Sequence, residues 1–177
     1  QPKNLEIDTI KNIKALSCYD SKDASFAAPA SGAHKPYTYE WYYQHVDSTT
    51  VKKLGSDSSV VTGVGRGEIA VKVYDKFKCD SFSIQFSFKE GTIFEDSIPS
   101  EISISVDNIV SSCALSDDGA IDLSASGGTG DKDFRIIATS TNDTIPTPPN
   151  WNENGDFTGL APDTYETYAM DNNGCIK

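Results

Sequence analysis

The chain has 177 residues, a net charge of −11 and a sequence pI near 4.5. Because nucleic-acid binding needs a basic surface and the 15 Lys and Arg residues are scattered, we expect no nucleic-acid partner. No apolar run approaches the roughly 20 residues of a transmembrane helix, so no direct membrane insertion is expected. The first residues also lack the basic and apolar parts of a signal peptide, which places any export signal or anchor outside these residues.

Two stretches of the sequence, residues 62–79 and 158–175, match position for position at an offset of 96. Thr, Gly, Asp and Cys recur at the same places, and the preceding stretches 18–41 and 113–136 align at an offset of 95. The chain is therefore predicted to be a tandem repeat. We expect one domain over residues 1–90, a short stiff linker over 91–100 and a second domain over 101–177.

The four cysteines fall two in each repeat, 61 and 62 residues apart. Of the three possible connectivities, only Cys18–Cys79 with Cys113–Cys175 treats the two copies alike, so one disulfide is expected in each. A disulfide that closes a loop of about 60 residues would raise the free energy of unfolding by roughly 4 kcal/mol in the chain-entropy model. Disulfides persist outside the cytoplasm, which predicts an extracellular protein. The alternative is four buried free thiols; without CxxC or a Cys/His cluster, no metal or other cofactor is expected.

The chain opens with a polar lead-in, residues 1–16, in which Ile7, Ile10 and Ile13 are three apart. We interpret it as an irregular first strand because its counterpart, residues 101–106, alternates with period two. The stretches 18–23 and 113–119 that follow are rich in Asp and Ser and predict a tight turn rather than a calcium loop, whose ligand spacing is absent. The glycines at 127–130 lack a phosphate-loop pattern and are interpreted as a strand connection.

Residues 36–44 predict a strand with Tyr37, Tyr39, Trp41 and Tyr43 on one face. An aromatic row is either a sugar-stacking platform or one wall of a core. The core is favoured because the second copy has Lys132, Phe134 and Ile136 there and so does not keep the row of flat rings that a shared binding platform would need. Tyr42 lies on the opposite face and remains a candidate ligand contact.

The next segments, 46–59 and 138–155, do not align. The first contains residues 49–54, a candidate edge strand whose lysines would discourage pairing with another strand. The second is rich in proline and is expected to be mostly irregular loop. It also contains Trp151, which either contacts a ligand or covers the end of the core.

Both copies then continue into a strand, residues 69–74 and 165–170. Tyr165 is a candidate for the tyrosine corner of a sandwich, with its ring buried and its hydroxyl bonded to nearby backbone. Asp75 and Asp171 are interpreted as turn caps in preference to metal ligands. Residues 81–88 alternate strictly and predict a final strand, whereas only Ile176 and Lys177 follow Cys175. Either the chain continues in the natural protein or a partner donates the missing strand.

These patterns predict an all-β fold of two tandem Ig-like β-sandwiches, the second lacking its final strand. With Ser17-Cys18, the strand 36–41 and the endings 158–165 and 171–175, each copy resembles a SprB repeat, a module of Bacteroidota gliding-motility adhesins and related surface proteins. The first copy departs from the family pattern at residues 66–69 and 76–78, and the second at 131–134. The resemblance implies type IX secretion and display at the outer-membrane surface.

The resemblance also implies a modification. O-glycans in this phylum are attached at Asp-Ser/Thr followed by an apolar residue or Thr. The candidate acceptors that fit the pattern are Thr9, Ser48, Ser97 and Thr144.

Candidate catalytic residues are not evident, since His34 and His45 lie near no motif and the carboxylates form no assignable acid and base pair. We therefore expect a non-enzymatic adhesive or structural module. Its partners would be a surface polysaccharide, a protein ligand or neighbouring repeats. The alternative is a carbohydrate-binding or spacer appendage of a secreted hydrolase, acting through Trp151 or Tyr42.

Overall fold

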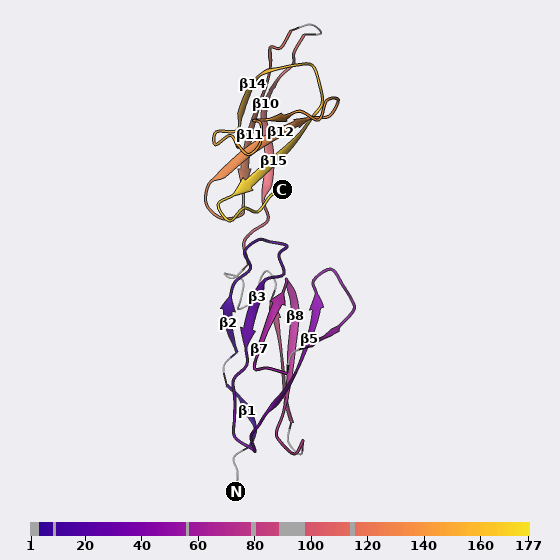
Figure 1. Ribbon diagram of the computed structural model, residues 1–177, viewed down its shortest axis with the longest axis vertical. Coiled ribbons are helices and arrows are strands. Elements are labelled where there is room, and N and C mark those ends of the chain that lie inside the picture. Colours follow the sequence, from indigo (N-terminus) through magenta and orange to yellow (C-terminus); the bar gives the residue numbers. More distant parts are fainter. Residues whose placement is uncertain (1–3, 9, 56, 79–80, 89–97, 114–115) are drawn as a thin grey trace. The chain divides into compact units, whose positions relative to one another are not determined.

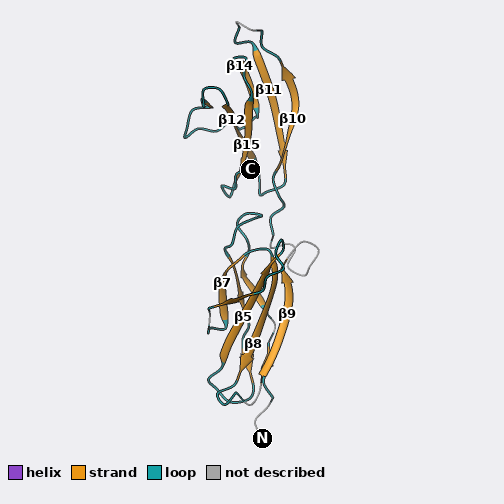
Figure 2. Cartoon of the chain, turned by 90° about the vertical axis from the view of Figure 1, so that its right-hand side faces the viewer, coloured by secondary structure: helices purple, strands orange, loops and turns teal. Residues whose placement is uncertain are grey.

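The computed structural model describes residues 4–8, 10–55, 57–78, 81–88, 98–113 and 116–177 (Figure 1). These residues form strands, turns and loops, and no helix occurs among them (Figure 2). The predicted all-β fold is confirmed. The chain divides into two compact units, Gln1–Pro99 and Ser100–Lys177, and most of the predicted linker, residues 91–97, lies outside the described residues.

The first unit is an antiparallel sandwich. One sheet has the order β2-β3-β7, the other has the order β6-β5-β8-β9, and β1 pairs with β4 in a short ribbon. The strands are β1 Glu6–Ile7, β2 Lys11–Lys14, β3 Ala24–Ala27, β4 Ala30–Ser31, β5 Thr38–His45, β6 Lys52–Leu54, β7 Val60–Val64, β8 Gly67–Tyr74 and β9 Ser81–Phe88. The lead-in is extended, as expected, but it is broken into β1 and β2.

The second unit has the same plan, with sheets in the order β10-β11-β14 and β13-β12-β15. Its strands are β10 Ser103–Val110, β11 Gly119–Ser126, β12 Lys132–Ala138, β13 Thr144–Ile145, β14 Asp156–Leu160 and β15 Tyr165–Asp171. In both units the first, second and fifth strands of an Ig-like sandwich share one sheet, and the third and sixth share the other. The predicted pair of Ig-like sandwiches is therefore confirmed.

The pairing registers repeat between the units. The equivalent pairs on the inner strands are Phe26 with Val61 and Ile121 with Phe157, and those on the facing sheets are Trp41 with Val71 and Ile136 with Thr167. Both inner ladders also shift register at the same place, just before Ser25 and just before Ala120. The offsets of 95 and 96 seen in the sequence therefore hold residue by residue in the fold.

The aromatic row of β5 is a wall of the first core. Trp41 is fully buried and Tyr39 nearly so, while Tyr37 and Tyr43 pack against the same cluster. The Trp41 indole N–H donates to the Ser58 carbonyl at 2.9 Å, which satisfies its one polar atom. The interpretation of this row as core is confirmed.

Each non-aligning segment contributes a short edge strand at the same position. The edge strand expected within residues 49–54 is β6, and it places Leu54 opposite Trp41. β13 places Ile145 opposite Ile136, the residue equivalent to Trp41. This two-residue strand lies in a segment that was expected to be mostly irregular, so the two segments share a role despite their unrelated sequences.

The final strand is complete in the first unit and only begun in the second. β9 has the predicted bounds and pairs along the whole of β8. In the second unit Ile176 bridges Met170, and Lys177 exchanges two backbone hydrogen bonds with Ala169, at 3.0 and 3.1 Å. These are the registers that Ser81 and Phe82 have on β8, so Ile176 and Lys177 occupy the first positions of the equivalent strand.

The predicted disulfide within the second unit is wrong. Cys113 is a free, exposed thiol, whereas Cys175 is disulfide-bonded. Cys113 lies near the start of β15, because its neighbour Ser112 lines a groove together with Tyr165. Cys175 lies near the end of β15, where its carbonyl accepts the Asp171 N–H. Seven strand residues span about 20 Å, far beyond the roughly 7 Å between Cα atoms that a disulfide allows. Cys18 is also disulfide-bonded, and Cys79 lies outside the described residues.

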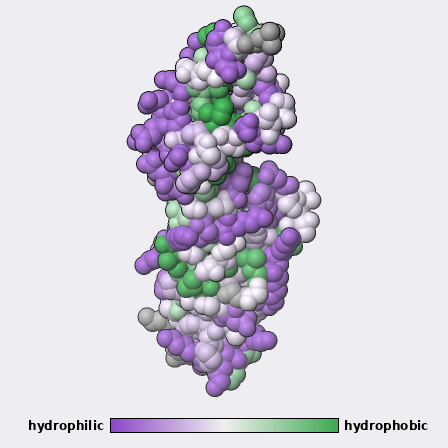
Figure 3. Space-filling view, turned by 45° about the horizontal axis from the view of Figure 1, so that its top comes forward, coloured by the Kyte–Doolittle hydropathy of each residue, from purple (hydrophilic) through white to green (hydrophobic). Residues whose placement is uncertain are grey.

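The surface agrees with the acidic composition. The face shown in Figure 3 is mainly hydrophilic, with smaller apolar patches in each unit. No helix among the described residues is long and apolar enough to cross a membrane.

Candidate functional site

The turn after the first cysteine is built alike in both units. The Ser21 hydroxyl donates to Asp23 at 2.6 Å, and the Ser116 hydroxyl donates to Asp118 at 2.7 Å. The Lys14 ammonium lies 2.7 Å from Asp23 and is the main cause, with Ser21, of the lowered pKa of that carboxyl. Both carboxylates are thus used to brace the turn, which confirms the turn interpretation; residues 114 and 115 of the second turn lie outside the described residues.

A buried aspartate caps the turn at the end of each sixth strand. Asp171 is 3% exposed and accepts backbone N–H groups from Asn173 and Cys175 at 2.9 Å and from Thr129 at 2.8 Å. Asp75, also 3% exposed, accepts the Phe77 N–H at 3.1 Å. Both are turn caps, as predicted. No group of three or more His, Cys, Asp or Glu residues that could hold a metal occurs in the described parts of the chain.

The glycine-rich stretch 127–130 joins β11 to β12 and follows the backbone of its own unit closely. Gly127 has φ of 78°, and a Cβ there would lie 1.9 Å from the Glu101 carbonyl oxygen. The Gly128 amide donates to the Ser100 carbonyl at 2.9 Å. The stretch is a strand connection, as predicted, and only glycine fits at position 127.

Tyr165 has the role of a tyrosine corner. Its ring packs against the core, and its hydroxyl donates to the Ala161 carbonyl at 2.9 Å. The first unit has an aliphatic residue, Ile69, at the equivalent position, and there Tyr43 donates to the Arg66 carbonyl at 3.0 Å instead. Both units therefore latch the turn before the sixth strand with a tyrosine hydroxyl.

Tyr42 belongs to a polar network on the outer face of the first unit. Its hydroxyl donates to Glu40 at 2.9 Å, the Tyr74 hydroxyl donates to the same oxygen at 3.2 Å, and the Lys53 ammonium lies 2.7 Å from the other oxygen. Lys53, and then Tyr42, hold the pKa of Glu40 at about 2. The network combines two half-buried rings with fixed charges across β5, β6 and β8.

Trp151 lies on the outer side of the second unit. Its ring stacks on the Arg135 guanidinium, with 4.1 Å between the guanidinium carbon and the ring centroid. Arg135 also donates to the Asn150 carbonyl at 2.7 Å, which ties the loop to β12. Trp151 is half-buried, and the prediction that it contacts a ligand or covers the end of the core stays open. Trp151 and Tyr42, the two predicted ligand contacts, belong to different units.

Two of the four candidate glycosylation residues lie among the described residues. Ser48 is half-buried, and its hydroxyl accepts the Thr50 N–H at 3.0 Å. Thr144 is half-buried in β13. Thr9 and Ser97 lie outside the described residues.

The fold and these sites define a class of protein, the tandem Ig-like β-sandwich protein whose polar residues mainly brace its turns. The sequence matches no family model and none of the curated proteins with which it was compared.

Proposed function

We propose that the chain is a non-enzymatic structural or adhesive module of an extracellular, outer-membrane-associated surface protein, built from SprB-like repeats and possessing a role in adhesion or gliding. The observation that carries this is the repetition of one sandwich with the same registers and the same turn braces. Tandem copies of a self-contained sandwich extend a protein and leave its loops for recognition.

The internal braces support a structural role. Asp171 and Asp75 hold the turns at one end of each sixth strand, and the hydroxyls of Tyr165 and Tyr43 hold the turns at the other. Both ends of each sixth strand are thereby held by side chains of the same unit. The expected partners of such a module are a surface polysaccharide, a protein ligand or neighbouring repeats.

The proposal is tested by locating the native protein. Antibodies against the two-unit chain should label intact cells, and a protease added outside the cells should remove the label. Label that appears only after the cells are opened would contradict it. Secretion and glycosylation are tested on the same material, because an intact mass equal to that of the bare polypeptide would remove the glycan proposal.

A second candidate is a carbohydrate-binding or spacer appendage of a secreted hydrolase. The observation that favours it is the half-buried Trp151 ring, which Arg135 holds in a fixed orientation on the surface. Aromatic rings held in this way can stack on sugars. A glycan array should then show binding that Trp151→Ala or Tyr42→Ala removes, whereas an array on which the unaltered protein binds nothing would contradict it.

A further inference from the structure

A small hollow lies on the outer face of the first unit, beside Tyr42 in β5. Its volume is about 90 Å³, and its walls include Tyr42, Gln44, Val51, Glu68 and Ala70. In the antiparallel ladder of β5 and β8, Tyr42 lies opposite Ala70 and Gln44 lies opposite Glu68, so these four side chains share one face. Because Ala70 has only a methyl group, the space between its larger neighbours stays open. We call this space the Tyr42 hollow.

The ring that forms one wall of the Tyr42 hollow is held in place by its hydroxyl. That hydroxyl donates to Glu40 at 2.9 Å, and the Lys53 ammonium lies 2.7 Å from the other oxygen of the same carboxylate. The face of an aromatic ring carries partial negative charge, so the weakly positive C–H groups of a sugar ring pack favourably against it. The wall formed by Tyr42 therefore suits a pyranose ring.

The other end of the Tyr42 hollow is polar. The Gln44 amide nitrogen donates to the Ser48 carbonyl at 2.7 Å, which orients the side chain, and none of the described residues donates to the amide oxygen. The Glu68 carboxylate belongs to the residue directly across the ladder. An amide oxygen and a carboxylate are both good acceptors, and two neighbouring hydroxyls of one sugar can donate to them together. Val51, which is 57% exposed, adds an apolar rim.

The charge around the Tyr42 hollow favours a neutral sugar. The charged side chains on this face of β5, β6 and β8 are Glu40, Glu68, Lys53 and Lys72, so their charges balance. The whole chain has a net charge of −11 and repels anions at longer range. A neutral polysaccharide is therefore favoured over one that carries carboxylate or sulfate groups.

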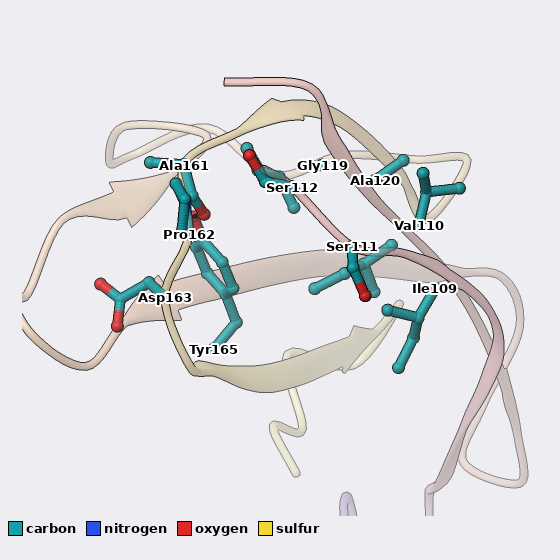
Figure 4. Close-up of a pocket in the computed structure, with 12 residues that line it drawn as sticks. Ile109, Val110, Ser111, Ser112, Gly119, Ala120, Ala161, Pro162, Asp163 and Tyr165 are labelled. Carbon is teal, nitrogen blue, oxygen red and sulfur yellow. Dashed lines mark hydrogen bonds between the residues drawn. The ribbon is translucent and has the colours of Figure 1, made fainter. Parts of the chain in front are cut away.

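The second unit does not keep the residues that form this hollow. Its equivalent cross-strand pair is Ile137 opposite Glu166, so an aliphatic side chain replaces the ring of Tyr42 and a longer side chain replaces Ala70. Tyr165 lines the groove of that unit (Figure 4), but its ring packs against the core and its hydroxyl donates to its own turn. The combination of a ring, a small residue and paired acceptors therefore belongs to the first unit.

We propose that the Tyr42 hollow binds one ring of a neutral polysaccharide. The sugar stacks on Tyr42, two of its hydroxyls donate to Glu68 and Gln44, and the small side chain of Ala70 makes room for its edge. This inference rests on the carbohydrate partner proposed above, and it assigns the binding to the first unit instead of to Trp151.

The test uses the full chain and an array of polysaccharides: neutral glucans, mannans and galactans, and polymers that carry uronic acid or sulfate. At least one neutral polysaccharide should bind, and an oligosaccharide of that type should shift the backbone amides of Gln44 and Ala70 in an NMR titration. An array without a neutral binder would overturn the inference, and so would shifts confined to the second unit. Neither result bears on the surface location of the protein, which cell labelling tests.

Variants of the hollow separate stacking, hydrogen bonding and space. Tyr42→Ala and Glu68→Ala should each weaken binding of that oligosaccharide about tenfold, as measured by calorimetry. Tyr42→Phe keeps the ring and should keep the affinity within about threefold. Ala70→Ile fills the hollow without removing a polar group, and it should abolish binding; a β-branched residue suits a strand, and an unchanged urea midpoint verifies the fold.

Two controls locate the site. Thr38→Ile makes a similar change on the same face of β5, outside the walls of the hollow, and should leave binding unchanged within about twofold. Trp151→Ala should also leave it unchanged. Loss of binding in Trp151→Ala with full binding in Tyr42→Ala would overturn this inference, while the proposed carbohydrate-binding function would stand. Equal losses in Thr38→Ile and Ala70→Ile would overturn the site as well.

Discussion

Replacing Asp171 with Ala tests whether this buried carboxylate holds the second sandwich together. The carboxylate accepts three backbone N–H groups, two from its own turn and one from Thr129 in the turn between β11 and β12. A hydrogen bond adds a net ~1 kcal/mol, and a donor left without its partner costs at least as much. Asp171→Ala should therefore lower the free energy of unfolding of the second unit by about 3 kcal/mol.

The two tryptophans provide an assay for each unit, because Trp41 lies in the first and Trp151 in the second. Protein labelled with fluorotryptophan should give two ¹⁹F resonances, and urea should unfold each at its own midpoint. With a slope of about 1 kcal/mol per molar urea for a domain of this size, the Trp151 midpoint should fall by about 3 M. The Trp41 midpoint should not change.

Two further variants show which atoms matter. Asp171→Asn keeps the oxygen that faces Asn173 and Cys175 and turns an amide toward Thr129, so its effect should be about one third to two thirds as large. Asp131→Ala, which removes an exposed carboxylate nearby, should change neither midpoint. The reasoning is refuted if Asp171→Ala shifts the Trp151 midpoint by less than the equivalent of about 1 kcal/mol, or if Asp131→Ala shifts it equally.

Three further predictions concern the tyrosine hydroxyls that hold the turns, the titration of Glu40 and the reactivity of the cysteines. Tyr165→Phe should lower the unfolding free energy of the second unit by about 1 kcal/mol in the ¹⁹F assay, and Tyr43→Phe should do the same for the first; an unchanged midpoint would show that the hydroxyls latch nothing. The pKa of Glu40 lies at about 2 instead of 4.5, so the stabilisation from its ionised form is complete above pH 4.5 and is lost as the pH falls toward 2. Lys53→Met should raise that pKa in a ¹³C carboxyl NMR titration, and a value of about 2 in the variant as well would assign the shift to the tyrosines. Maleimide should label Cys113 in the folded, unreduced protein and Cys175 only after reduction, as read by peptide mass spectrometry; prompt labelling of Cys175 would contradict its disulfide.

Local sequence signals predicted most of the strands. Residues 81–88 alternate at every position and are bounded by turn or polar residues, and the strand found there has the same bounds. The tyrosine corner was also predictable, since a Tyr that follows a short Asp-containing turn at the start of a strand is the usual signal. Strand alternation and the tyrosine corner both depend on residues close together in the sequence, so one sequence is enough to predict them.

Other features depend on distances that the sequence does not measure. The equal spacing of the cysteine pairs suggested a bond within each repeat, yet Cys113 and Cys175 lie near opposite ends of β15. Equal spacing shows only that the two copies are alike. β13 was missed for a different reason: two residues are too few to show a period, and only the pairing with β12 reveals the strand.

The tyrosine that holds the turn before the sixth strand occupies different aligned positions in the two units, so aligning the repeats residue by residue hides its common role. Tyr43 and Ile69 face each other across β5 and β8, and their equivalents Ala138 and Tyr165 face each other across β12 and β15. The pair keeps one tyrosine and one smaller aliphatic residue, but the tyrosine has moved to the other strand. A hydroxyl from either strand reaches the turn before the sixth strand, because cross-strand neighbours on one face lie only about 5 Å apart. The hydrogen bond that holds this turn therefore needs a tyrosine at either position of the cross-strand pair. An alignment of one strand alone shows two unrelated residues and misses this.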